Sequence, residues 1–376
     1  MNELFDKMVS LDSPYFNEQI ITYLGNKRSL LKEINPLIVE VLKKLNKEKL
    51  VTLDLFSGSG IVARLLKQYS SLVIANDLEK YSELINNVFL SNTNELNKDQ
   101  FNFYLEKINK AVQEKPVKGI ITTLYSPEDD NDIRPGERVF YTHENAILID
   151  SYHYYIEKLV PAELKKYFLA SLITEASIHV NTSGVFKGFY KDKITGIGKF
   201  GGSGENALSR IKGKIQLKMP ILSNVVSNYL VYREDALNIS SSLKGLDLVY
   251  LDPPYNQHPY GSNYFMLNLI IENKNPGNIS KVSGIPERWN HSAFNRKKDA
   301  LISMEQIIKT LDTKFALVSY NNEGFISYDE MESMLKKYGK VKSKQIIYNT
   351  FRGSRNLRNR NIHTNEFLFL LDKRGD

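Results

Sequence analysis

The stretch LDPPY places an acid, two prolines and a tyrosine directly after the mostly apolar run Leu246–Leu251. Proline donates no backbone hydrogen bond and fixes φ, so Pro253 and Pro254 end a strand and stiffen the turn after it. The Asp252 carboxylate and the Pro253 carbonyl then form a fixed pair of acceptors beside the Tyr255 ring. Such a set suits a planar heterocycle with an exocyclic –NH₂, because the acceptors bind the amine hydrogens while the ring stacks on the tyrosine. Nothing in the stretch suits hydride transfer.

A second pattern is DLFSGSG, in which the apolar run at 50–56 ends in a glycine turn. Gly58 and Gly60 have no side chains, so a ligand can approach the backbone and the N–H groups of the following helix. Asp77 ends the next apolar run, where a carboxylate can bind ribose hydroxyls or cap a helix. These residues predict an adenosine-containing cofactor, either NAD or S-adenosylmethionine. The alternative for the glycines is a tight turn of any doubly wound fold.

Both patterns require strands whose carboxyl ends meet at one edge of a sheet. The apolar runs at 50–56 and 72–75 are each followed by a helical pattern, and two such units predict a parallel sheet. Later helices are predicted at about 263–273, 297–311 and 328–338. The last two strands have no helix between them, which predicts an antiparallel pair at the edge. The later strands are predicted at Asn228–Tyr232, Leu246–Leu251, Phe315–Tyr320, Lys344–Tyr348 and Glu366–Leu371.

The middle of the chain has a different pattern. From about residue 97 to 218 long helical periodicities dominate, followed by a basic glycine-rich stretch, and no strand alternation stands out. This predicts a mainly helical insert. We therefore expect a first catalytic and cofactor-binding part at 1–98, an inserted domain at 99–225, and a second catalytic part at 226–376.

Composition narrows the class of protein. The chain has 376 residues, 42% of them hydrophobic and 25% charged, which is ordinary for a soluble globular protein. No apolar stretch approaches the ~20 residues that span a bilayer, and the N-terminus lacks a signal-peptide pattern, so we expect a cytoplasmic location. The absence of cysteine excludes disulfides, thiolate metal sites and a cysteine nucleophile. The six histidines show no ligand spacing, so no metal is predicted. The net charge of +7 favours a polyanionic partner.

Taken together, the motifs resemble those of the DNA adenine-N6 methyltransferases of the Dam and FokI modification-methylase type. D-P-P-Y lies at 252–255 and F-x-G-x-G at 56–60, while YLGNKRSLL at 23–31 looks like the family's N-terminal cofactor motif. YREDAL at 232–237 is similar to the acid-containing motif after the third strand, and NQHPYGSNYFMLNLI is close to the FokI-type pattern. The motifs follow the family's order, although Asn26 stands where Dam-type enzymes often have glycine.

The resemblance implies a Rossmann-like α/β class I methyltransferase fold. Its sheet would have seven strands, mostly parallel with an antiparallel edge strand, and the helical insert would be a target-recognition domain. The cofactor would be S-adenosyl-L-methionine, and Asp252, Pro253, Pro254 and Tyr255 would bind the target base. The cofactor residues implied by the resemblance are Tyr23, Gly25, Asn26, Lys27, Asp54, Phe56, Ser57, Gly58, Gly60, Asp77, Asp235 and Ala236.

The resemblance also implies an activity. The chain would transfer a methyl group to the N6 amine of a flipped-out adenine in double-stranded DNA, as the modification enzyme of a restriction–modification system. A cognate restriction endonuclease would act on the same site without stable contact, and the enzyme would be a monomer or weak dimer. The alternatives are an RNA adenine or DNA cytosine-amine methyltransferase, or a catalytically silent DNA-binding module of the same fold.

Two basic, glycine- or asparagine-rich segments are predicted to contact the DNA backbone, a solvated lysine-rich loop being the alternative reading of the first. One lies in the insert, and the other joins the last two strands. The residues predicted to bind DNA are Lys187, Lys191, Lys193, Lys199, Arg210, Lys212, Arg352, Arg355 and Arg358.

Overall fold

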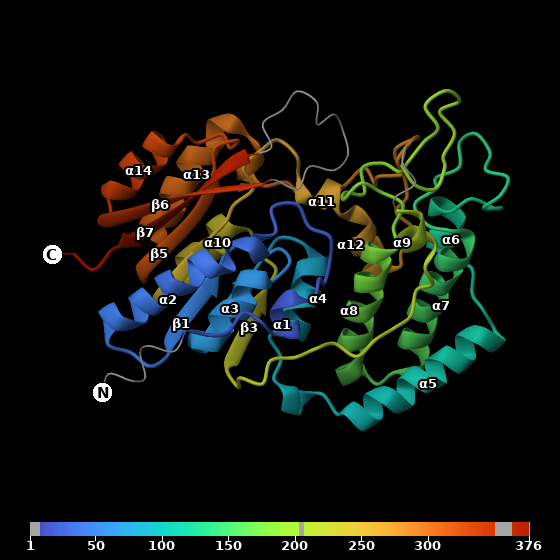
Figure 1. Ribbon diagram of the computed structural model, residues 1–376, viewed down its shortest axis with the longest axis horizontal. Helices are drawn as coiled ribbons and strands as arrows, with labels where there is room; N and C mark the ends of the chain where they lie inside the picture. Colours follow the sequence, from blue (N-terminus) through green and yellow to red (C-terminus); the bar gives the residue numbers. More distant parts are fainter. Residues whose placement is uncertain (1–7, 203–206, 350–362, 376) are drawn as a thin grey trace.

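A seven-stranded sheet forms one half of the computed structural model, which describes residues 8–202, 207–349 and 363–375 (Figure 1). The strand order is β3-β2-β1-β4-β5-β7-β6. Strand β4 is buried along its whole length, as expected for a central strand that is covered by helices on both faces. The strands are β1 Leu50–Asp54, β2 Ser70–Asn76, β3 Asn228–Tyr232, β4 Leu246–Leu251, β5 Thr313–Asn321, β6 Lys340–Asn349 and β7 His363–Asp372.

The predicted direction of the strands is confirmed. Strands β1 to β5 pair in parallel, and β7 pairs antiparallel with both β5 and β6. The antiparallel pair lies at the edge, as predicted, but the strand that runs against the others is β7, and β6 is outermost. Strand β1 ends at Asp54 rather than at residue 56. The Leu55 N–H still donates to the Tyr250 carbonyl, and the chain then turns away from the sheet.

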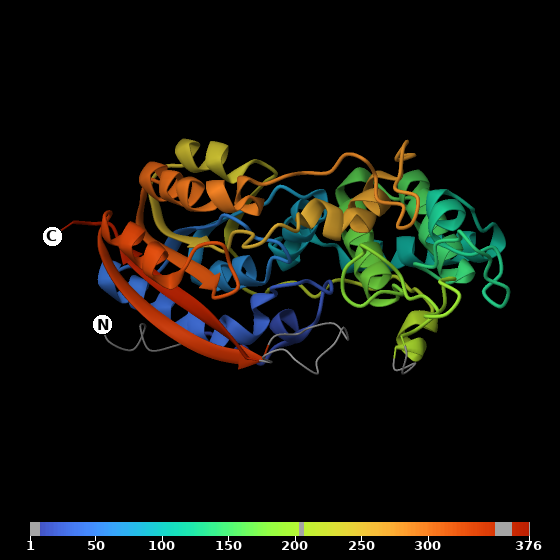
Figure 2. The same ribbon diagram turned by 90° about the horizontal axis from the view of Figure 1, so that it is seen from above.

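Helices cover both faces of the sheet, and Figure 2 shows them on opposite sides. Apolar residues of α2 and α3 pack on one face in one buried cluster, and those of α10, α13 and α14 pack on the other face in a second cluster. The helices of this half are α1 Pro14–Asn17, η1 Lys27–Leu30, α2 Leu31–Leu45, α3 Ile61–Tyr69, α4 Lys80–Phe89, α10 Ala236–Ser242, α11 Tyr260–Asn263, α12 Phe265–Glu272, η3 Ala293–Asn295, α13 Lys297–Thr310 and α14 Tyr328–Lys336.

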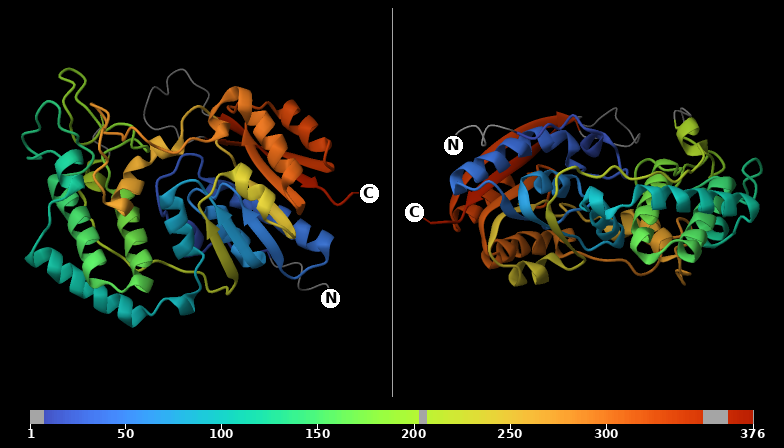
Figure 3. Two further views of the ribbon diagram at one scale, coloured as in Figure 1. Left: turned by 180° about the vertical axis from the view of Figure 1, so that it is seen from behind. Right: turned by 90° about the horizontal axis from the view of Figure 1, so that it is seen from below.

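A second group of helices lies beside the sheet, and the view from behind in Figure 3 separates the two groups. A third buried cluster joins α5, α7 and α8 to α4 and α12. Helix α12 follows the DPPY stretch in the sequence but packs among α4, α7 and α8, so the loop after Tyr255 is tied to both halves. The helices of this group are η2 Thr93–Glu95, α5 Lys98–Glu114, α6 Ile120–Tyr125, α7 His143–Leu159, α8 Ala162–Ile178 and α9 Leu208–Lys212.

The strand order places a crevice at one edge of the sheet. From β1 the chain proceeds outward to β2 and β3, whereas β4 lies on the other side of β1 and leads to β5. Ligands of open α/β sheets bind at such a switch point, beyond the carboxyl ends of the strands. Asp54 at the end of β1 is in register with Tyr250 of β4, so the glycine turn and the DPPY stretch are neighbours. Within the ranges described above, no helix is both long and apolar enough to cross a membrane.

Candidate active site

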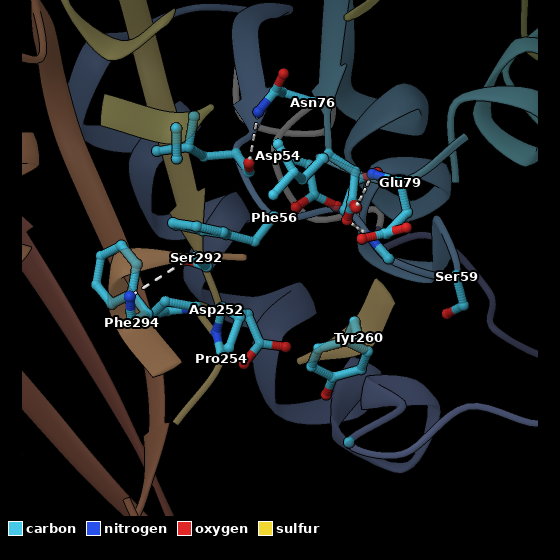
Figure 4. Close-up of a pocket in the computed structure, with 18 of the residues that line it drawn as sticks. Asp54, Phe56, Ser59, Asn76, Glu79, Asp252, Pro254, Tyr260, Ser292 and Phe294 are labelled. Carbon is cyan, nitrogen blue, oxygen red and sulfur yellow. Dashed lines mark hydrogen bonds between the residues drawn. The ribbon is translucent and has the colours of Figure 1, made fainter. Parts of the chain in front are cut away.

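A pocket opens at the carboxyl ends of β1, β2 and β4, with about 990 Å³ of empty space that is partly open to solvent (Figure 4). All the predicted catalytic and cofactor residues line this pocket except Gly60. Gly60 instead forms the N-cap of α3 behind the pocket wall. The structure therefore brings together, from five separate stretches of sequence, the residues that the motifs singled out.

The glycine turn after β1 is shaped by close contacts. Gly58 has φ of +51°, and a Cβ there would lie 2.8 Å from the Tyr23 ring, so no larger residue fits without movement. Its N–H donates to the Asp77 carboxylate at 2.8 Å, and the Glu79 N–H donates to the other oxygen of that carboxylate at 2.9 Å. Asp77 thus fixes the turn against the end of β2 and caps the chain that leads into α4. Burial raises the pKa of Asp77.

Asp54 is the unusual group of the pocket. Its side chain is only 1% exposed, and neither carboxylate oxygen has a hydrogen-bond partner among the described residues. Burial raises its pKa well above the ordinary value, and the nearby charge of Asp252 adds to the rise. The N–H groups of Ala63 and Phe56 offset part of this rise without making well-formed hydrogen bonds. A buried, unpaired carboxylate at a pocket wall is suited to a ligand that brings a cation or N–H donors.

The segment around Gly25 is held by tyrosines from beyond the DPPY stretch. The Tyr23 ring stacks on Tyr260 and Tyr264, with ring centroids 5.0 and 4.9 Å apart. The Leu24 N–H donates to the Tyr264 hydroxyl at 2.7 Å, and the Tyr260 hydroxyl donates to the Leu24 carbonyl at 3.0 Å. These contacts seat the N-terminal motif over the glycine turn. Tyr260, in the loop that follows the DPPY stretch, also lines the pocket.

Asn26 and Lys27 follow, and they have different roles in the structure. The Asn26 side chain accepts the Arg28 N–H at 2.8 Å and so caps η1. The Lys27 ammonium is buried between two carboxylates, 3.0 Å from Asp252 Oδ1 and 2.9 Å from Glu366 Oε1. Burial alone would lower the pKa of Lys27, but the two carboxylates raise it well above the ordinary value, so the side chain is charged.

Asp252 itself is mostly buried, with 18% of its side chain exposed. Burial raises the pKa of Asp252 to about 7 against the opposing charge of Lys27, and the charge of Glu366 adds to the rise. The carboxyl group therefore titrates near neutrality, and its ionised form is a strong hydrogen-bond acceptor that can also take up a proton. Tyr255, next to it, is held through its backbone carbonyl, which accepts the Phe325 N–H at 3.2 Å.

The far end of the pocket is partly aromatic. The Phe56 ring meets Phe294 edge-to-face, with centroids 5.3 Å apart, and Asp235 caps α10 by accepting the Leu237 N–H at 2.8 Å. Ala236 is buried beside this cap. The stretch around Phe294 also lines the pocket. Sequence motifs did not predict this, because the stretch offers only one phenylalanine among mainly polar residues.

Glu79 is a further residue that sequence reasoning missed. It is 2% exposed, and its carboxylate accepts the side-chain amides of Asn268 at 2.6 Å and Asn290 at 3.3 Å. Burial raises its pKa to about 7, and the charge of Asp77 adds to the rise. Glu79 thereby links the end of β2 to α12 and to the chain before η3.

The basic segment of the insert approaches the loop after Tyr255. The Lys187 ammonium lies 3.5 Å from His258 Nδ1, and the Phe186 N–H donates to the Asn263 carbonyl at 2.8 Å. Burial lowers the pKa of Lys187. Further along, Lys191, Lys193 and Lys212 are exposed and Lys199 is half-buried.

Arg210 differs from these lysines. Its guanidinium donates to the carbonyls of Ile178, Val180 and Thr182, at the end of α8 and just beyond. This bonding favours a structural role for Arg210 over the predicted contact with DNA. The predicted residues Arg352, Arg355 and Arg358 lie outside the described residues.

Comparison with known proteins identifies the class of protein to which this pocket belongs. Residues 23–334 match the family model of the D12 class N6 adenine-specific DNA methyltransferases. The chain is 31% identical over 85% of its length to the type II methyltransferase M.CviAII of Paramecium bursaria Chlorella virus 1, of which it covers 89%. It is 29% identical over 94% of its length to the type II methyltransferase M.NlaIII of Neisseria lactamica, of which it covers 99%. It is 28% identical over 93% of its length to the type II methyltransferase M.FokI of Planomicrobium okeanokoites, of which it covers 52%. The predicted resemblance is confirmed, and the chain belongs to the D12 class of N6 adenine-specific DNA methyltransferases.

Proposed function

We propose that this chain methylates the N6 amine of an adenine, flipped out of double-stranded DNA, at a short recognition site with S-adenosylmethionine as the methyl donor. The observation that carries the proposal is a single pocket shared by two sets of groups. One wall holds the unpaired carboxylate of Asp54 and the backbone at Gly58, and the other holds Asp252, Pro253 and Tyr255. A cofactor and a base can therefore meet inside one cavity.

The pocket fits the cofactor by its hydrogen-bond acceptors and by its open backbone. Asp54 would bind the ammonium group of the cofactor's methionine end, because its two buried oxygens have no hydrogen-bond partner among the residues that the structure describes. The turn at Gly58 leaves room that a Cβ would fill. Asp77 would use its remaining lone pairs for ribose hydroxyls, and Phe56 would pack against the adenine ring. When bound, the cofactor supplies a methyl group on a positively charged sulfur atom.

The DPPY stretch would prepare the target amine for attack. The lone pair of the exocyclic nitrogen is delocalised into the adenine ring, so the free amine is a poor nucleophile. Hydrogen bonds to the Asp252 carboxylate and the Pro253 carbonyl favour a pyramidal nitrogen with a localised lone pair. As positive charge develops on that nitrogen, Asp252 stabilises it and then accepts the released proton. The Tyr255 ring would stack on the flipped base.

The function can be tested directly in cells. We expect methylation-sensitive sequencing of DNA from cells that express the chain to find N6-methyladenine within one short motif. Cells that express Asp252→Ala should lack the mark at equal protein levels. A mark on the cytosine amine, a mark confined to RNA, or DNA binding without any methylation would each contradict the proposal and support one of the alternatives. A restriction endonuclease blocked by the same mark would support a restriction–modification role.

We also propose that residues 99–225 recognise the target DNA through the basic segment that contacts the loop after Tyr255. Replacing Lys191, Lys193 and Lys199 with Gln should weaken DNA binding and reduce the slope of log K against log salt by up to about 3. The matched control is a triple Gln variant of lysines exposed on α13, remote from the insert, and it should leave the slope unchanged. An unchanged slope in the first variant would refute the contact. The control lysines are Lys297, Lys298 and Lys309.

A further inference from the structure

The most unusual contact of the pocket involves a residue that belongs to no motif. Glu366 lies on β7 with its side chain fully buried, and its carboxylate is 2.9 Å from the Lys27 ammonium. It also accepts the hydroxyl of Ser319, from the neighbouring strand β5. Lys27 in turn is 3.0 Å from Asp252, so a buried bridge connects the antiparallel strand of the sheet to the DPPY stretch.

We propose that Glu366 is a positioning residue for methyl transfer, which holds the Lys27 ammonium between two carboxylates so that the Asp252 carboxylate stays basic enough to act on the target amine. The inference rests on the proposed function of Asp252. Glu366 itself would not touch the base or the cofactor.

The physical reason is the balance of charge around Lys27. An ammonium that faced Asp252 alone would lower the pKa of that carboxylate and make it a weaker acceptor and base. The charge of Glu366 opposes this and raises the pKa of Asp252, although burial is the largest contribution. Lys27 is only 4% exposed, so water cannot replace either carboxylate without rearrangement. Proton acceptance is most efficient when the pKa of the base lies near the working pH.

The register of the sheet holds the bridge in place. Glu366 is paired with Asn321 across β5 and β7, and β5 lies next to β4, which ends immediately before Asp252. Titratable groups reach Asp252 from several elements, so its pKa belongs to the whole set. In the described part of the chain, the groups that face Asp252 electrostatically are Lys27, Asp54, Tyr250, Tyr255, Tyr260 and Glu366.

The test compares the pH dependence of methyl transfer in two variants that should move in opposite directions. In Glu366→Gln the acidic limb of kcat/KM should shift down by about 1 pH unit, and the plateau rate should fall about threefold to tenfold. In Lys27→Met the same limb should shift up, because the opposing cation is gone. Affinity for DNA should stay within about twofold of wild type in Glu366→Gln, because the residue lies outside the proposed DNA contacts.

Controls separate this role from a merely structural one. Glu366→Asp should restore part of the plateau rate, and Lys344→Met should change neither limb nor rate. The latter removes an exposed pair in which Lys344 and Glu33 lie 2.6 Å apart. If Glu366→Gln does not fold, Ser319→Ala replaces it. That variant keeps the charge of Glu366 but removes the Ser319 hydrogen bond to its carboxylate, and it should shift the limb in the same direction by less.

The outcomes are distinct. An acidic limb within about 0.2 pH unit of wild type in Glu366→Gln, or shifts of the same sign in Glu366→Gln and Lys27→Met, would overturn the inference. An inactive wild-type chain on adenine-containing DNA would instead overturn the proposed function itself. Opposite shifts with intact DNA binding would establish Glu366 as a positioning residue.

Discussion

The two ends of strand β4 carry opposite arrangements of charge. At its beginning, the buried carboxylate of Asp247 binds two lysines, Lys47 and Lys314, each at 2.8 Å, and accepts the Val51 N–H at 3.0 Å. Just past its end, one buried lysine lies between the carboxylates of Asp252 and Glu366. One carboxylate thus faces two lysines at the beginning of β4, and one lysine faces two carboxylates just past its end.

The pKa values follow this arrangement. Burial alone would raise the pKa of Asp247, but the hydrogen bonds from Lys314, Lys47 and the Val51 amide hold it below its ordinary value. At the other end burial raises the pKa of Asp252 to about 7, and Lys27 only partly opposes the rise. The first carboxylate is saturated and stabilises the fold. The second keeps acceptor capacity at a pocket, as expected for a group that acts on a ligand.

The largest expected effect comes from replacing Asp252, just past the end of β4. Asp252→Asn should lower the single-turnover rate of methyl transfer about 10³-fold, because the amide is neutral and can accept no proton. Cofactor binding should stay within about threefold of wild type, since Lys27 keeps its contact with Glu366. Rapid-quench assays with radiolabelled cofactor and equilibrium binding measure the two quantities. A rate within about tenfold of wild type would contradict the proposed role of Asp252.

The matched change at the structural end should have the opposite outcome. Asp247→Asn should lower the free energy of unfolding by about 2–3 kcal/mol, because two lysines and the Val51 amide lose a charged acceptor. The rate per folded molecule should be unchanged. Urea denaturation with active-site titration measures both. Lost activity at full stability would mean that the two ends of the strand are not separate in function.

Sequence reasoning found the residues that lie in local patterns and missed those that act through tertiary pairing. Strand ends, glycine turns and the DPPY stretch are continuous in the chain, so residue types and spacing suffice to place them at one edge. Glu366 lies over 100 residues beyond Asp252 and reaches Lys27 only because β7 inserts between β5 and β6. No local pattern encodes that order.

For the same reason, the roles of individual charged residues could not be predicted from the sequence alone. Lys27 lies in the predicted cofactor motif, but its ammonium contacts two carboxylates. Arg210 lies in a basic stretch, but its guanidinium donates to backbone carbonyls at the end of α8. A cation's role is determined by the acceptors nearest to it in the fold, and those acceptors are distant in sequence.

Stability against pH should sharpen the comparison, because the two acids have pKa shifts of opposite sign. The depressed pKa of Asp247 contributes stability above the unfolded pKa of about 4 that is lost as the pH falls below it. The raised pKa of Asp252 contributes stability that is full below about pH 4 and is lost as the pH rises toward about 7.

Each contribution can be measured as a difference between wild type and an Asn variant. Relative to Asp252→Asn, wild type should lose free energy of unfolding between about pH 4 and pH 7. Relative to Asp247→Asn, it should lose free energy only below about pH 4. Methyl transfer should rise through about pH 7 as Asp252 ionises, so activity and stability respond to this residue in opposite directions. Difference curves that are flat for both variants would refute the contrast.

The smallest expected effects are those of single replacements of the lysines around Asp247. Lys47 and Lys314 are 39% and 44% exposed, so each pair is screened by water, whereas Lys27 is buried. Replacing either lysine with Met should cost about 0.5 kcal/mol, because the other still holds the carboxylate. Replacing both should cost about 2–3 kcal/mol, more than the sum, because Asp247 is then a buried charge without a cation. A double-mutant cycle by urea denaturation measures the coupling. Strict additivity would show that neither lysine compensates for the loss of the other, and the proposed saturation of the Asp247 carboxylate by two cations would then be contradicted.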